Sequence, residues 1–398
     1  MTDTVVHSVR LITAGIDGTQ CDINRAWVHM RGGVIVGVGE GDSWRRVVSS
    51  STTVVDALSA IGPGAILTPG LVDIHCHGGG GFGFDGPPDD IAAVAHTHLR
   101  HGVTSVVASL VSAPVDVLQV QLATIRDAAP LSPSIIGAHL EGPFIDAAHC
   151  GAHDPSALSA PDLVQLKSLL DTGIVCQVTL APELAGGMEA VRLIHAAGAA
   201  AAVGHTGADA ATAQLAFDGG ARLLTHTFNA MSPLHHREPG PVGAAIADGR
   251  VTLEVVPDGH HVDPRVVAML FRAAPGRVAI VSDAMAAAAA PDGLYPLGSL
   301  TTEVALGVAR IQGTATIAGS TLTLDRAVRN CVAFGVSLTD ALAAATVVPA
   351  RAIGRPDLGV ISVGGPTDVV LWDCDLVIAR VWKAGEPALR NPGSLSRG

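Results

Sequence analysis

Eight short apolar runs alternate along the chain with helix-like segments, and this alternation constrains the fold more than any other feature. Each run has the length of a buried strand, and a helix-like stretch separates it from the next, which is the pattern of parallel β/α units. Eight is the number of strands that a closed (β/α)8 barrel requires. The runs cover residues 71–77, 104–111, 135–142, 174–183, 200–206, 222–230, 251–259 and 277–284.

The segments between the runs carry helix signals of their own. Leu118, Leu122 and Ile125 are spaced as i, i+4 and i+7, so they share one helix face. Ser337, with Asp340 three residues later, predicts the N-cap of another helix. These signals support the alternation of strands and helices.

Both chain ends have the pattern of a small β domain, with short β-branched runs punctuated by glycine and no helical periodicity. The 398 residues suffice for a barrel of about 250 residues and a satellite domain. Aromatic residues make up only 3% of the chain, so Ala, Val, Leu and Ile must fill the core. We expect an α/β protein: a TIM-like barrel over residues 67–356 and a β-sandwich built from residues 1–66 and 357–398.

Charge and cysteine content exclude several classes of protein. The net charge is −12 and only two lysines occur, Lys167 and Lys383, so no basic surface is available for nucleic acid or anionic lipid. Six cysteines are scattered without a CxxC pair, as in reduced intracellular proteins. No signal peptide or membrane-spanning run is recognisable. We expect a cytoplasmic protein that binds neither nucleic acid nor membrane.

Two histidines in the first barrel run indicate a site. His75 and His77 are separated by one residue, and alternate residues of a strand share a face, so both imidazoles point the same way. His96 and His98 have the same spacing but lie in a helix-like segment, where their rings diverge. Only the first pair therefore predicts a pair of ligands.

Other candidate ligands stand at the ends of later runs, where the C-terminal face of a barrel carries its chemistry. A single histidine there is more often structural, but several imidazoles and carboxylates in register predict a metal centre. Nitrogen and oxygen donors without a thiolate suit Zn²⁺ or Fe²⁺ in a catalytic site. These candidates are Glu141, His205, His226, His261 and Asp283.

Together these residues resemble the amidohydrolase superfamily, through residues 64–78, the pair His205 and His226, Asp283, and the flanking β domain. Within it the chain is similar to the N-acetylglucosamine-6-phosphate deacetylase family over nearly its whole length. The motifs that carry this likeness are HLEGPF (139–144), GAH (151–153), VGHT (203–206), THTFNAM (225–231), HREPG (236–240), DGHH (258–261), SDAM (282–285) and IAGS (317–320).

The resemblance implies one metal held by Glu141, His205 and His226, and a second held by His75, His77 and Asp283, with Glu141 shared. Many superfamily members bridge two metals with a lysine after the fourth strand, but this chain has LAPE there. We expect a divalent ion, Zn²⁺ before Fe²⁺, in one or two copies per subunit.

The implied reaction is hydrolysis of the acetamide of an amino-sugar phosphate by a metal-activated water. Asp283 would move the proton, and His153 or His261 would stabilise the oxyanion. Arg237 would bind the phosphate, since a guanidinium fork suits that group. The substrate-binding set that the resemblance implies is Ala152, His153, Asn229, Ala230, Arg237, His261, Ile317, Ala318 and Gly319.

Alternatives remain open at this stage. The chain could be another N-acyl-amino-sugar or N-acyl-amino-acid deacetylase, or a non-catalytic structural relative, although no expected ligand is missing. Arg237 could be an ordinary surface residue, and Cys150 a bystander beside the substrate site. A homodimer is the expectation of the family, and the sequence does not decide the metal, its copy number or the tolerance for other hexosamine phosphates.

Overall fold

The computed structural model describes residues 2–15 and 19–390, and its central element is a parallel sheet of eight strands. Strand order follows the chain from β6 to β15, so each strand pairs with the preceding one. An isolated parallel bridge between Cys76, at the end of β6, and Ala284, in the segment after β15, closes the barrel. The strands are β6 (Leu71–Cys76), β9 (Val103–Leu110), β10 (Ile135–Glu141), β11 (Val175–Leu180), β12 (Ala200–Val203), β13 (Leu223–Leu224), β14 (Thr252–Val255) and β15 (Val278–Ile280). The predicted barrel is confirmed.

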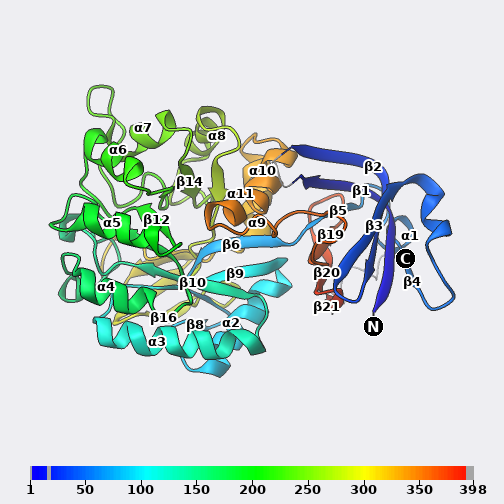
Figure 1. Ribbon diagram of the computed structural model, residues 1–398, viewed down its shortest axis with the longest axis horizontal. Helices are drawn as coiled ribbons and strands as arrows, with labels where there is room; N and C mark the ends of the chain where they lie inside the picture. Colours follow the sequence, from blue (N-terminus) through cyan, green and yellow to red (C-terminus); the bar gives the residue numbers. More distant parts are fainter. Residues whose placement is uncertain (1, 16–18, 391–398) are drawn as a thin grey trace.

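Helices surround the barrel (Figure 1) and cover its outer face with apolar side chains. Leu118, Leu122 and Ile125 are fully buried on α3, and Ser337 caps α10 through the amide of Asp340, as predicted. The helices are α2 (Pro88–Arg100), α3 (Val115–Ala128), α4 (Leu163–Leu170), α5 (Gly187–Ala196), α6 (Ala210–Asp218), α7 (Gly240–Ala247), α8 (Pro264–Ala273), α9 (Leu324–Ala333), α10 (Leu338–Ala344) and α11 (Val347–Ala352). Short 3-10 turns are η2 (Ala129–Leu131), η3 (Ala147–His149) and η4 (Pro155–Ala157).

Strands from both chain ends form one further sheet beside the barrel (Figure 1). Strand β5 pairs with β1 from the N-terminal side and with β19 from the C-terminal side. This sheet has its own apolar core, around Met30 and Trp382. Its elements are β1 (Asp3–Ala14), β2 (Gln20–Arg31), β3 (Val34–Glu40), η1 (Gly41–Arg46), β4 (Thr53–Asp56), α1 (Ala57–Ile61), β5 (Ile66–Pro69), β19 (Val369–Trp372), β20 (Ile378–Lys383) and β21 (Glu386–Arg390). Residues 391–398 of the predicted sandwich lie outside the described part.

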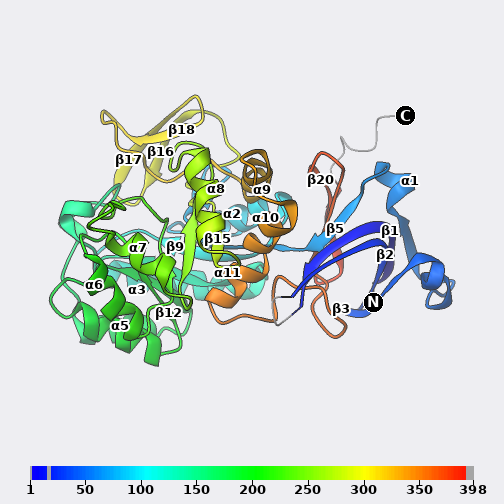
Figure 2. The same cartoon turned by 90° about the horizontal axis from the view of Figure 1, so that it is seen from above.

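The structure contains a small antiparallel sheet between β15 and α9 that the sequence pattern did not predict. It consists of β16 (Gly293–Leu297), β17 (Leu300–Ala305) and β18 (Val308–Ile311), and Figure 2 shows it at the edge of the barrel. A two-stranded ribbon, β7 (Gly78–Gly79) and β8 (Phe82–Gly83), follows β6. Within the described residues, no helix has the length and apolar character needed to cross a membrane.

Candidate metal centre and substrate pocket

Six side chains at the C-terminal ends of the barrel strands converge on one point. They form two groups whose donor atoms lie within 4.8 Å of one another in each group. The first group is Glu141, His205 and His226, and the second is His75, His77 and Asp283. All six are buried. The structure thus brings together the six residues that the sequence suggested as ligands.

Glu141 is the centre of the first group. Its Oε1 atom lies 3.1 Å from Nε2 of His205 and 3.0 Å from Nε2 of His226, and these two nitrogens are 3.0 Å apart. Ligands bound at ~2.0–2.2 Å around one ion sit roughly 3 Å from each other. The donors therefore have the spacing of a metal coordination sphere.

The second group shares Glu141 with the first. Nε2 of His77 lies 3.2 Å from Oε2 of Glu141, and Nε2 of His75 lies 3.3 Å from Oε1. Oδ1 of Asp283 is 3.6 Å from His75 Nε2 and 3.5 Å from His77 Nε2. Four imidazole nitrogens and two carboxylates without a thiolate fit Zn²⁺ or Fe²⁺.

Backbone geometry at the strand ends aims three of these side chains. His205, His226 and Asp283 follow two or three residues after their strands end, and their φ angles are 47°, 24° and 47°. Positive φ is uncommon for residues other than glycine and is concentrated at functional sites. The backbone turns sharply at each of these three residues and directs the side chain into the barrel mouth.

The buried carboxylates and imidazoles shift one another's pKa. Burial raises the pKa of Glu141, but the charge of His75 and hydrogen bonds from neighbouring imidazoles hold it well below its usual value. Burial also raises the pKa of Asp283, yet His75 and His77 lower it overall. The pKa of His77 is about 9, because Asp283 and Glu141 outweigh burial. The centre therefore favours positive charge, which protons or a metal ion can supply.

His153 presents a neutral N–H to the centre. The amide of Ser112 donates to Nδ1 of His153, so the ring proton must sit on Nε2, which lies 3.3 Å from Oε2 of Glu141. Burial lowers the pKa of His153 to about 4, although Glu141 opposes the shift. The imidazole is therefore a fixed hydrogen-bond donor near neutral pH.

His261 lies beside Asp283. Its Nδ1 is 2.7 Å from Oδ2 of Asp258, and its Nε2 is 3.8 Å from Oδ2 of Asp283. Burial lowers the pKa of His261, but the carboxylates of Asp258 and Asp283 raise it above the usual value. This imidazole is thus suited to donate a proton or a hydrogen bond toward Asp283.

A pocket of about 370 Å³ opens above the centre, a volume suited to a small molecule. Its lining includes five of the six candidate ligands, His75 being buried behind them. Of the other predicted site residues, it includes Ala152, His153, Asn229, Ala230, His261, Ile317 and Gly319. Ala318 is fully buried, and Arg237 lies on an exposed loop and does not line the pocket.

Several pocket residues escaped sequence reasoning. Leu297, at the end of β16, and Thr316, after β18, both line the pocket, so the small antiparallel sheet and the segment after it supply part of the lining. His149 also lines the pocket, and its carbonyl accepts a hydrogen bond from Nδ1 of His205 at 2.8 Å. Glu183, in the LAPE segment, does not line the pocket; its carboxylate accepts hydrogen bonds from Thr206 and from the amide of Gly207, next to His205.

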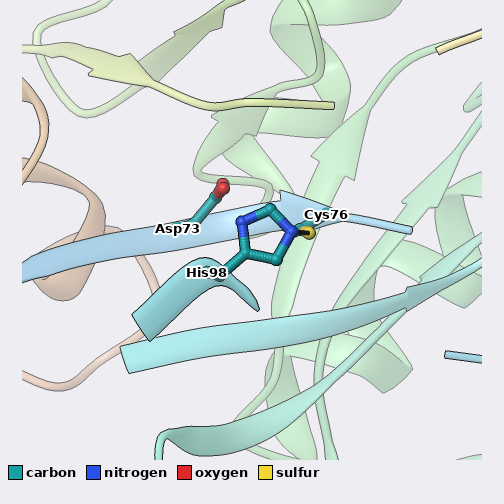
Figure 3. Close-up of side chains that lie close together, drawn as sticks. All are labelled: Asp73, Cys76 and His98. Atoms are coloured by element: carbon teal, nitrogen blue, oxygen red, sulfur yellow. Dashed lines mark hydrogen bonds between the residues drawn. The ribbon is translucent and has the colours of Figure 1, made fainter. Parts of the chain in front are cut away.

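A third cluster, Asp73, Cys76 and His98, lies outside this pocket (Figure 3). Asp73 and Cys76 belong to β6, and His98 to α2. Nε2 of His98 lies 2.9 Å from the carbonyl oxygen of Gly78, so that nitrogen carries a proton and is not free to bind a metal. The bond ties α2 to the segment that follows His77.

Comparison with known proteins identifies the family. The sequence model that represents the amidohydrolase family matches residues 66–388 of this chain. This chain belongs to the amidohydrolase family. Human N-acetylglucosamine-6-phosphate deacetylase is 36% identical over 340 residues, covering 81% of this amidohydrolase and 83% of the human protein. N-acetylgalactosamine-6-phosphate deacetylase of Escherichia coli O157:H7 is 35% identical, covering 81% of this chain and 88% of that protein.

Among solved structures, an N-acetyl-D-glucosamine-6-phosphate deacetylase of Mycobacterium smegmatis superimposes on this amidohydrolase with a TM-score of 0.90. The two are 36% identical, and the match covers 98% of this chain and 100% of the other. That structure is of an aspartate-to-alanine variant in complex with N-acetyl-D-glucosamine 6-phosphate. The relatives thus share both the fold and one class of substrate.

Proposed function

We propose that this amidohydrolase hydrolyses the acetamide of N-acetyl-D-glucosamine 6-phosphate, releasing acetate and D-glucosamine 6-phosphate. The convergence of Glu141, His205 and His226 with His75, His77 and Asp283 below a small-molecule pocket carries the proposal. Its substrate follows from the relatives, which are named for deacetylation of hexosamine 6-phosphates.

The two groups would hold one or two divalent ions, with Zn²⁺ the first choice. A bound ion lowers the pKa of water to near ~7 and polarises a carbonyl oxygen. All other steps fall to the side chains of the chain itself.

Asp283 would act as the proton shuttle. Its carboxylate stands beside both His75 and His77 and within 3.8 Å of His261, so it faces the point where water and the amide would meet. It would accept the proton of the attacking water and deliver it to the departing amine. His261 would hold that carboxylate in place or stabilise the developing charge.

His153 would stabilise the oxyanion that forms at the acetyl carbonyl. Its Nε2–H is fixed by the hydrogen bond from Ser112 and needs no reorganisation during the reaction. The neutral ring keeps its donor over the whole physiological pH range, because its pKa is about 4.

The sugar phosphate would lie toward Asn229, Ala230 and the segment 317–319, with Arg237 binding the phosphate. Within a single subunit, Arg237 is exposed and does not line the pocket. The assignment therefore requires that its loop moves toward the pocket, or that a second subunit completes the pocket in a dimer. We also propose a homodimer, a cytoplasmic location, and domains at residues 1–66 with 357–398 and at 67–356.

The experiment is an acetate-release assay on metal-free protein before and after addition of Zn²⁺. The proposal predicts release from N-acetylglucosamine 6-phosphate only with the metal. N-acetylgalactosamine 6-phosphate is the second substrate to compare, because one relative is named for it. Faster turnover of that epimer would keep the deacetylase and reassign the sugar, and no release from either would refute the proposal.

A further inference from the structure

We propose that Glu254, in the middle of β14, is a positioning residue that orients His75 for metal binding. The side chain of Glu254 is fully buried, and its Oε2 atom lies 3.1 Å from Nδ1 of His75. The inference rests on the proposed metal centre and adds to it a residue that touches neither the pocket nor the substrate.

The contact fixes which nitrogen of His75 is available. An ionised carboxylate only accepts hydrogen bonds, so Nδ1 of His75 must carry the proton that it shares with Glu254. The Nε2 atom, which faces Glu141 and Asp283, is then the nitrogen left to bind an ion. A carboxylate behind a ligating imidazole fixes the ring and increases its basicity.

Glu254 is itself held by groups from other strands. Its Oε1 atom accepts a hydrogen bond from Nε2 of Gln177 on β11 at 2.7 Å, and Oε2 accepts from the amide of His226 at 3.3 Å. Gln177 is also fully buried. The carboxylate is therefore held in one position, and its hydrogen bond fixes the orientation of the His75 ring.

The effect should be specific to one of the two groups. His205 has a different partner for its Nδ1, the carbonyl of His149, and Glu254 contacts His226 only through the backbone. Loss of the Glu254 carboxylate should therefore weaken binding at His75, His77 and Asp283. It should leave the ion at Glu141, His205 and His226 in place.

Two variants separate orientation from mere burial. Glu254→Leu removes the acceptor at similar volume and leaves Nδ1 of His75 without a partner. Glu254→Gln keeps an oxygen that can accept the hydrogen bond from His75. Its NH2 group then faces Gln177, whose Oε1 has no partner and can accept from that NH2 group once the Gln177 amide is rotated. Asp325→Leu is the matched control, since Asp325 is buried and lies 3.1 Å from Nδ1 of His101, away from the pocket.

The measurement is the stepwise Zn²⁺ affinity of metal-free protein, titrated against a chromophoric chelator. We expect Glu254→Leu to bind the first ion as the wild type does and the second about 10–100-fold more weakly. Glu254→Gln should stay within a few-fold of the wild type, and Asp325→Leu should leave both affinities unchanged. An unchanged second affinity in Glu254→Leu, or equal losses for both ions, would overturn the inference.

Two further results keep this test apart from that of the function. If Glu254→Leu does not fold, Glu254→Asp serves in its place, because the shorter side chain moves the carboxylate away from His75. Unchanged affinity for the second ion in Glu254→Asp would also overturn the inference. Wild-type protein that binds two ions but releases no acetate would refute the proposed function and leave the role of Glu254 standing. A His75→Ala variant with wild-type affinities would refute the role of Glu254 and would also remove His75 from the proposed ligands, whereas acetate release tests the function separately.

Discussion

Oε1 of Glu141 lies 3.3 Å from Nε2 of His75, so the carboxylate from β10 joins the two groups of candidate ligands. Glu141 belongs to the group of His205 and His226, yet its Oε1 pairs with His75 and its Oε2 with His77 in the other group. Among the described residues, no other member of either group pairs through both of its oxygens with two members of the other group. The two groups are therefore parts of a single centre.

Substitution Glu141→Ala should empty that centre. Removal of an outer partner of a ligand costs ~10–100-fold in metal affinity, and a ligand itself should cost more. We expect a loss of at least ~100-fold for every ion, with acetate release falling in parallel. Metal content after dialysis is the readout, and Glu189→Gln on the surface of α5 is the control. Full metal content in Glu141→Ala would contradict the shared role.

Substitution Asp283→Asn should separate metal binding from turnover. The amide keeps an oxygen for the ion but cannot shuttle a proton, so kcat should fall by about 10²–10⁴-fold. Metal content should fall much less. Turnover near that of the wild type would remove Asp283 from the proton-transfer role.

Substitution Arg237→Ala tests the phosphate assignment. If its guanidinium binds the phosphate, KM for the phosphorylated sugar should rise by roughly 10–100-fold, as for a lost charged hydrogen bond. Hydrolysis of the unphosphorylated sugar should not change. Arg265→Ala is the matched control, because Arg265 is exposed and paired with Asp263 on α8. Equal kinetic constants in the Arg237 variant and the wild type would refute the assignment.

Acid should abolish the contribution of Asp325 to stability. Burial raises the pKa of Asp325, but His101 and Arg329 lower it to about 2, against about 3.9 in an unfolded chain. A depressed carboxyl pKa stabilises the fold above the unfolded value, and this stabilisation is lost as the pH falls from about 4 to about 2.

Asp325→Asn should therefore lower the free energy of unfolding by about 1–3 kcal/mol at pH 6 and by almost nothing near pH 2. Denaturant titrations at several pH values measure the difference. Asp127→Asn, whose side chain is 70% exposed, should show no such difference at any pH. A gap between wild type and Asp325→Asn that persists below pH 2 would contradict this account.

The sequence predicts the barrel and the cluster of candidate ligands because both depend on short-range patterns. Strand length and alternation locate β6 to β15, and the spacing of His75 and His77 places two imidazoles on one face whatever the rest of the chain does. His205, His226 and Asp283 follow because parallel strands end at the same rim.

Features that depend on distant contacts escaped this reasoning. The strands β16 to β18 are only 5, 6 and 4 residues long, and Gly293 and Pro296 interrupt the pattern of the first, so a short sheet is not distinguishable there from a loop. Glu254 sits in the apolar run 251–256, and its partners His75 and Gln177 come from strands far away in the sequence. A lone carboxylate inside an apolar strand was the only local sign, because a buried charge needs a partner.

The most direct test of the central claim is kcat/KM for acetate release from N-acetylglucosamine 6-phosphate and from N-acetylglucosamine, measured side by side on Zn²⁺-loaded protein. We predict a preference of at least ~100-fold for the phosphorylated sugar, the size expected for one charge-assisted anion contact. Equal rates for the two sugars, or no acetate from either, would contradict the assignment of this chain as a hexosamine 6-phosphate deacetylase.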